Sequence, residues 1–242
     1  MLNRTRRGWA AACLLGFGLL FVGFSLSGLL QSLLWSSDWP DPATLPSFDP
    51  ATGFGGLDPQ LASALYRRNL AYHFIHITVF GAVIGWMQTR VLQAPGIRAG
   101  WWVLLTSLGF ASIFVFEAFR PGIVTGGHPA PFEPLLIGVA GGTIAGTYQW
   151  AYLRRRGIAA TKWLALWIVG LCAGAVVAAI VLTLLGFLGP FMRSVIPERH
   201  LFSVSQLVFY IVYGPTVGAV AGLSSGSAMM EALPDPPGRT PA

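Results

Sequence analysis

The chain has 242 residues, of which 54% are hydrophobic and only 10% are charged, and its formal net charge is +6. A soluble domain carries about 25% charged residues, so this chain is too poor in charge to cover a globule with a surface that water tolerates. The composition therefore excludes an ordinary soluble protein and predicts that lipid covers much of the surface. The modest positive charge indicates orientation in a bilayer rather than binding to nucleic acid.

Apolar stretches long enough to cross a bilayer follow one another along the chain, since a membrane-spanning helix needs about 20 apolar residues. They cover residues 9–34, 69–92, 101–119, 132–153, 163–188 and 201–227. The sequence thus predicts an all-α integral membrane protein with six transmembrane helices in one domain, residues 1–233. We also expect a proline-rich outer loop at residues 36–60 and a disordered cytoplasmic tail at residues 234–242.

Basic residues gather in every second connection between the predicted spans. One side collects Arg4, Arg6, Arg7, Arg90, Arg98, Arg154, Arg155, Arg156, Lys162 and Arg239, against only Glu231 and Asp235. The other side mixes five arginines with seven acidic residues. Because lysine and arginine mark cytoplasmic loops, the first side and both termini are expected in the cytoplasm. We therefore predict a multi-pass protein of the bacterial cytoplasmic (inner) membrane.

A glycine–glutamine motif recurs along the chain. Its copies are Gly81, Gly85 and Gln88, then Gly142, Gly146 and Gln149, and then Gly214 and Gly218 with Ala221 in place of glutamine. Glycines four apart share a helix face, and such a face lets another helix approach closely. Each copy closes a pair of spans that begins with a basic residue and a tryptophan (Trp9, Trp101 and Trp163), which are expected at the headgroup level. The pattern predicts three related helical hairpins that pack through these glycines.

The second copy continues as Gln149-Trp150 and reaches Leu153-Arg154. This G-x-x-x-G-x-x-Q-W pattern resembles polytopic bacterial membrane proteins that carry tandem copies of the motif and have no assigned activity. The resemblance covers the second helix of each predicted hairpin, which we call the return helix. It is incomplete, because Thr89 follows Gln88 and the third copy lacks the glutamine. It implies helix packing and no particular chemistry.

Gln88, Gln149 and Glu117 could form a polar site within the membrane. Because an unpaired amide in lipid costs several kcal/mol, each glutamine is expected to lie near the cytoplasmic headgroups or to bond a neighbouring helix. The alternative is a site for a solute or a headgroup between hairpins. Glu117 is a candidate proton carrier or counter-ion, but Arg120, three residues on, is expected to pair with it.

His73 and His76 lie three apart in the second predicted span and so share a helix face. They could ligate a metal or a pigment. No recognised metal-ligand spacing accompanies them, so the cofactor is unknown and the sequence requires none.

Three functions are compatible with these features. The first is a non-enzymatic scaffold or accessory subunit in a larger membrane complex, and the second is a small-solute or lipid carrier with a site between hairpins. The third is a cofactor- or pigment-bearing electron-transfer subunit that uses His73 or His76. The near absence of charge in the spans favours the first, and no phosphate-binding loop or nucleophile motif suggests an enzyme. The expected partners are the lipid bilayer and other membrane subunits, not nucleic acid.

Overall fold

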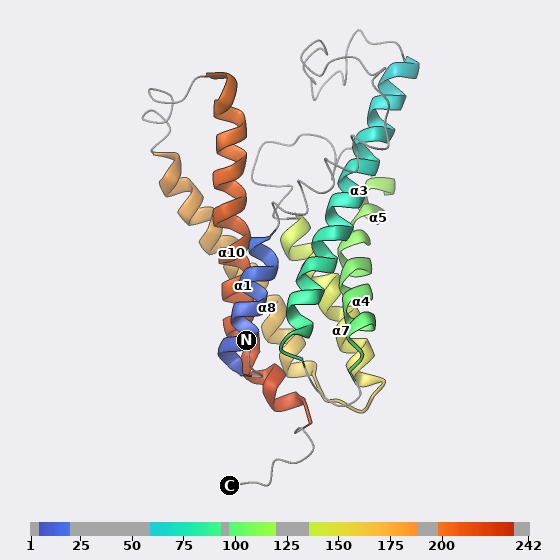
Figure 1. Cartoon of the computed structure of the whole chain (residues 1–242), viewed down its shortest axis with the longest axis vertical. Coiled ribbons are helices and arrows are strands. Elements are labelled where there is room, and N and C mark those ends of the chain that lie inside the picture. The colour runs from blue at the N-terminus through green and yellow to red at the C-terminus, as the bar shows by residue number, and fades with distance from the viewer. Residues whose placement is uncertain (1–4, 20–58, 93–96, 120–135, 188–197, 235–242) are drawn as a thin grey trace.

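The computed structural model describes residues 5–19, 59–92, 97–119, 136–187 and 198–234. These residues form helices and contain no strand, which confirms the all-α prediction (Figure 1). The helices are α1 (Arg6–Gly18), α3 (Pro59–Thr89), α4 (Ala99–Ala111), α5 (Phe114–Phe119), the π-helix η2 (Leu136–Gly141), α7 (Gly142–Arg154), α8 (Thr161–Gly186) and α10 (Glu198–Ala232). The predicted outer loop lies outside the described residues, except that its last two residues already belong to α3.

Within the described part of the chain, three helices are long and apolar enough to cross a membrane. They are Tyr66–Thr89, Ala99–Phe116 and Thr161–Gly186. Burial supports this assignment, because no more than a third of each apolar window is buried inside the protein (28–33%). Apolar side chains therefore face outward as well as inward, as they do where lipid is the solvent.

Local chemistry explains several helix ends. Thr5 caps α1, because its hydroxyl oxygen accepts the backbone N–H of Gly8 at 3.0 Å. Between α4 and α5, the hydroxyl of Ser112 donates to the carbonyl of Leu108 at 2.7 Å, a bond that bends helices. The turn after α7 needs a glycine, since Gly157 has a φ of 77°. This turn lets α8 return directly beside α7.

The helices contact their neighbours in chain order, from α1 through α3, α4, α7 and α8 to α10, and α10 then packs against α1. The contacts therefore close on themselves. Figure 1 shows the N-terminal ends of α1, α4 and α8 at the lower end of the bundle, together with the C-terminal ends of α3, α7 and α10. Successive helices in this series thus run in alternating directions.

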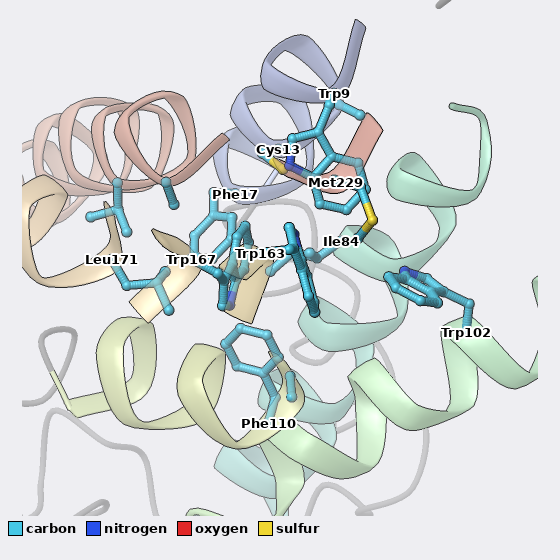
Figure 2. Packing of buried hydrophobic residues seen from close by; sticks show 14 of the residues in the cluster. Trp9, Cys13, Phe17, Ile84, Trp102, Phe110, Trp163, Trp167, Leu171 and Met229 are labelled. Atoms are coloured by element: carbon cyan, nitrogen blue, oxygen red, sulfur yellow. The ribbon is translucent and has the colours of Figure 1, made fainter. Parts of the chain in front are cut away.

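Aromatic side chains fill the space inside this series. Its fully buried members include Trp9, Trp102, Trp163, Trp167, Phe17 and Phe110. Figure 2 shows the indoles of Trp163 and Trp167 in the middle of the cluster. The ring of Trp163 lies 6.3 Å from that of Trp9 and 6.2 Å from that of Trp102, between centroids.

Trp9 and Trp163, which are predicted to lie at the headgroup level, are fully buried inside the protein near the starts of α1 and α8. In the second predicted hairpin the buried residue is Trp102, whereas Trp101 is 50% exposed. Buried indoles usually find an acceptor for their N–H, and Trp9 and Trp102 do so, at Ser225 and Gln88 respectively.

Candidate functional site

A hydrogen-bonded cluster of polar side chains lies inside the bundle, and both motif glutamines belong to it. Gln88 and Gln149 are fully buried, and the amide nitrogen of Gln149 donates to the side-chain oxygen of Gln88 at 3.0 Å. The same oxygen accepts the indole N–H of Trp102 at 2.9 Å. Gln149 also donates to the hydroxyl of Thr106 at 2.7 Å. The cluster therefore joins α3, α4 and α7.

Elementary donor–acceptor chemistry sets the direction of these bonds. An indole N–H only donates, so Gln88 must present its oxygen to Trp102. That oxygen can only be met by a donor from Gln149, which therefore presents its NH₂ group. The amide nitrogen of Gln88 is left for α1, where it lies 3.8 Å from the sulfur of Cys13. Of the amide atoms of the two glutamines, only the side-chain oxygen of Gln149 takes part in none of these bonds.

The motif glycines lie where α3, α7 and α10 each pack against a neighbouring helix. We call the contacts of α3 with α4, of α7 with α8 and of α10 with α1 the three seams. At the α3–α4 seam, a Cβ on Gly81 would lie 2.9 Å from the Cα of Ser107, and one on Gly85 would lie 2.9 Å from the Cα of Val103. Only glycine allows backbones to approach this closely.

The α10–α1 seam repeats this geometry one helical turn later than the sequence motif predicts. Counted from the buried tryptophan, Gly85 meets residues one and four further on, Val103 and Thr106. At the α10–α1 seam the glycine that meets the equivalent residues, Ala10 and Cys13, is Gly222.

Gly218 in turn meets Cys13 and Phe17, as Gly81 meets Thr106 and Phe110. The third copy is therefore Gly218, Gly222 and Ser225. Gly214 also packs against α1, at Phe17, but it has no counterpart in the first copy.

Ser225 takes the place of the glutamine in this third copy. It is fully buried, and its hydroxyl oxygen accepts the indole N–H of Trp9 at 3.1 Å. The bond is equivalent to the one between Trp102 and Gln88. A buried tryptophan is thus held by a polar side chain from the preceding return helix at two of the three seams.

A second set of glycines, which the sequence motif did not reveal, lies seven residues after Trp9, Trp102 and Trp163. Its members are Gly16, Gly109 and Gly170. Each faces the residue directly before the second motif glycine, namely Ile84, Ala145 and Ala221 respectively. The spacing Trp-x₆-Gly is visible in the sequence and distinguishes Trp102 from Trp101, but it also matches Trp150 with Gly157 and Trp167 with Gly174.

The α7–α8 seam differs from the other two. Here the motif glycines face side chains, because a Cβ on Gly142 would lie 2.8 Å from Cδ1 of Leu171 and one on Gly146 would lie 2.6 Å from Cδ1 of Trp167. Trp167 occupies the position that Thr106 and Cys13 hold elsewhere, four residues after the buried tryptophan. Its N–H donates to the carbonyl of Gly142 at 2.9 Å.

The equivalent tryptophan–glutamine bond is missing at this seam. The indole nitrogen of Trp163 and the side-chain oxygen of Gln149 are both buried, and neither has a hydrogen-bond partner within the part of the chain that the structure describes. The side chains themselves are 0% and 1% exposed. The indole N–H of Trp163 and the side-chain oxygen of Gln149 are therefore a buried donor and a buried acceptor without hydrogen bonds.

Of the other predicted site residues, the structure describes the side chains of His73 and His76. The backbone of Glu117 belongs to α5, but its side chain lies outside the described residues, as does Arg120. His73 and His76 belong to α3, where the ring of Tyr72 lies 5.5 Å and 6.2 Å from theirs. Among the described residues, no group of three or more His, Cys, Asp or Glu side chains could hold a metal ion.

The cluster is suited to joining helices rather than to acid–base chemistry. Its members are amide, indole, hydroxyl and thiol groups, and none of the described carboxylate side chains belongs to it. No protein-family model, curated protein or solved structure matches the chain.

Proposed function

We propose that the chain is a six-span membrane protein built from three related helical hairpins, and that it is a non-enzymatic scaffold or accessory subunit of a larger membrane complex. It shares its tandem glycine–glutamine motif with the polytopic bacterial membrane proteins that it resembles. The observation that carries the proposal is that the aromatic and polar side chains around Gln88 are fully buried inside the protein.

The repeated contacts support the six-span arrangement. Each proposed hairpin places a glycine, seven residues after its tryptophan, against its own return helix, and each return helix carries the motif glycines that meet the next hairpin. Three spans satisfy length and apolarity within the described residues. The other three, α1, α7 and α10, occupy equivalent places in the series of contacts.

The filled interior favours a scaffold over a carrier. Four fully buried tryptophans occupy the space in which a carrier would need a passage. The described polar side chains there are neutral and bond to one another. A charged solute would have no counter-charge in this interior, and such counter-charges are typical of transport sites.

Charge supports an orientation with both termini in the cytoplasm. The helix ends at the lower end of the bundle carry Arg6, Arg7, Arg90, Arg154 and Lys162 (Figure 1). Such an excess of basic residues is typical of the cytoplasmic side of a bacterial inner-membrane protein.

Purification in mild detergent from native membranes tests the proposed function. A tagged chain should bring down a small, reproducible set of membrane polypeptides in fixed ratio. The test variant is Gly109→Leu, which cannot pack against Ala145 and should lose those polypeptides. The matched control is Gly186→Leu, at a position with open space around it, which should retain them.

The opposite result would be a parent chain that purifies alone. Uptake of a solute into proteoliposomes, lost in Gln149→Leu, would then favour the carrier. Visible absorbance or stoichiometric metal in the purified protein would favour a cofactor-bearing subunit.

A further inference from the structure

The absence of a hydrogen bond between Trp163 and Gln149 at the α7–α8 seam is explained by a neighbouring side chain, that of Trp167. At the other seams the motif glycines meet backbone atoms, including the Cα atoms of Val103 and Ala10. At the α7–α8 seam they meet the ends of side chains from Leu171 and Trp167. Two helices separated by side chains stand further apart than two helices in backbone contact.

Trp167 is the side chain that makes this difference. It is fully buried, stacks on Trp163 at 6.2 Å between ring centroids, and is anchored by its bond to the carbonyl of Gly142. The equivalent residues at the other seams are the much smaller Thr106 and Cys13. A large, anchored ring therefore keeps α7 and α8 apart at the level where a tryptophan and a glutamine would otherwise bond directly.

The competing partners of Gln149 act in the same direction. Its amide nitrogen bonds both Gln88 and Thr106, which holds the side chain toward α3 and α4. The equivalent nitrogen of Gln88 makes only the long contact with the sulfur of Cys13. Gln149 is thus held back from α8, while Trp163 is held by its stack on Trp167.

We propose that this seam is a binding site for one buried water molecule, which accepts the indole N–H of Trp163 and donates to the side-chain oxygen of Gln149. A buried polar group without a partner costs about 1–3 kcal/mol, so a donor on α8 and an acceptor on α7, two helices in contact, favour such a ligand. Water is the smallest molecule that supplies both an acceptor and a donor, and buried waters typically bridge polar groups in this way. The site is independent of the proposed scaffold function.

The indole N–H groups of the protein labelled with ¹⁵N at tryptophan test the proposal by NMR in detergent. The Trp163 signal should show a cross-peak to a bound water, whereas the Trp102 signal, whose N–H is bonded directly to Gln88, should show none. Trp163→Phe and Trp102→Phe assign the two signals. A Trp163 signal without a water cross-peak would overturn the proposal.

A crystal structure of the parent protein provides a second test that needs no variant. Density for one water within about 2.7–3.2 Å of both Trp163 Nε1 and Gln149 Oε1 would support the site. A direct bond between those two atoms, or an apolar contact that excludes water from both, would refute it. Trp167→Thr, which restores the residue type of the α3–α4 seam, should replace the water with a direct bond and abolish the cross-peak.

Discussion

The indole nitrogen of Trp102 lies 2.9 Å from the side-chain oxygen of Gln88, and this bond joins α4 to α3 inside the bundle. Because an indole only donates, the bond sets the orientation of the Gln88 amide and, through it, that of Gln149. Gln88 is therefore the residue on which the interior hydrogen bonds depend most.

Gln88→Leu should destabilise the protein while nearly conserving side-chain volume. The change removes the acceptor of both Trp102 and Gln149, and it leaves the N–H of Trp102 buried without a partner. We expect the free energy of unfolding to fall by about 1–3 kcal/mol. Thermal denaturation in detergent measures the loss.

The matched control for that experiment is Thr89→Val on the same helix. The hydroxyl of Thr89 is exposed and bonds only the carbonyl of Trp86 in its own helix. Its loss should change the midpoint little. Equal midpoints for Gln88→Leu and the parent would contradict the assigned role of Gln88.

Gly109→Ala should show that the glycines seven residues after each buried tryptophan are needed for packing. A Cβ at this position would overlap the backbone of Ala145, and overpacking of this kind costs about 1–3 kcal/mol. Gly100→Ala in the same helix is the control, since nothing lies within 4 Å of a Cβ there. Alanine favours helix over glycine, so Gly100→Ala should be neutral or slightly stabilising. The prediction fails if both variants melt alike.

Much of the fold could be predicted from the sequence, because apolar length and glycine spacing are local properties. The all-helical membrane class and the close packing at Gly81 and Gly85 followed from them. The register of the third copy could not be chosen in this way. Gly214, Gly218, Gly222 and Gly226 follow one another at intervals of four, so three registers fit the glycine spacing equally, and only the contacts of Gly222 with Ala10 and Cys13 distinguish them.

The burial of the tryptophans could not be predicted for a different reason. The indole N–H of Trp9 donates to Ser225, 216 residues away. A serine at that distance carries no sign of its partner in the sequence. The preference of tryptophan for the headgroup level predicts its depth in the bilayer and not which helix covers the ring.

Ser225→Ala tests the third seam. The variant removes the acceptor for the indole of Trp9 without altering packing volume much, and we expect a loss of about 1 kcal/mol in the free energy of unfolding. Thr183→Ala, which removes an exposed hydroxyl bonded within α8, is the control. If Thr183→Ala lowers the thermal midpoint as much as Ser225→Ala, the bond at the third seam contributes no more than a surface hydroxyl.

The ion pair between Lys162 and Glu231 should matter little. It joins the start of α8 to the end of α10 at 2.8 Å, but the side chains are 69% and 61% exposed. Exposed pairs typically contribute about 0–1 kcal/mol and are screened by salt. Glu231→Gln should therefore leave the thermal midpoint nearly unchanged at high salt. A loss comparable to that of Gln88→Leu would mean that this pair holds the helices together.

The membrane topology tests the central claim most directly. Single cysteines at Arg155 and Arg239, or at Asp49 and Arg193, are introduced into a chain without Cys13 and Cys172, and intact cells are treated with a membrane-impermeant maleimide. Six spans with both termini inside predict labelling at Asp49→Cys and Arg193→Cys, with labelling at Arg155→Cys and Arg239→Cys only after the membrane is opened. Labelling of Arg155→Cys from outside, or of all four positions from the same side, would contradict the account.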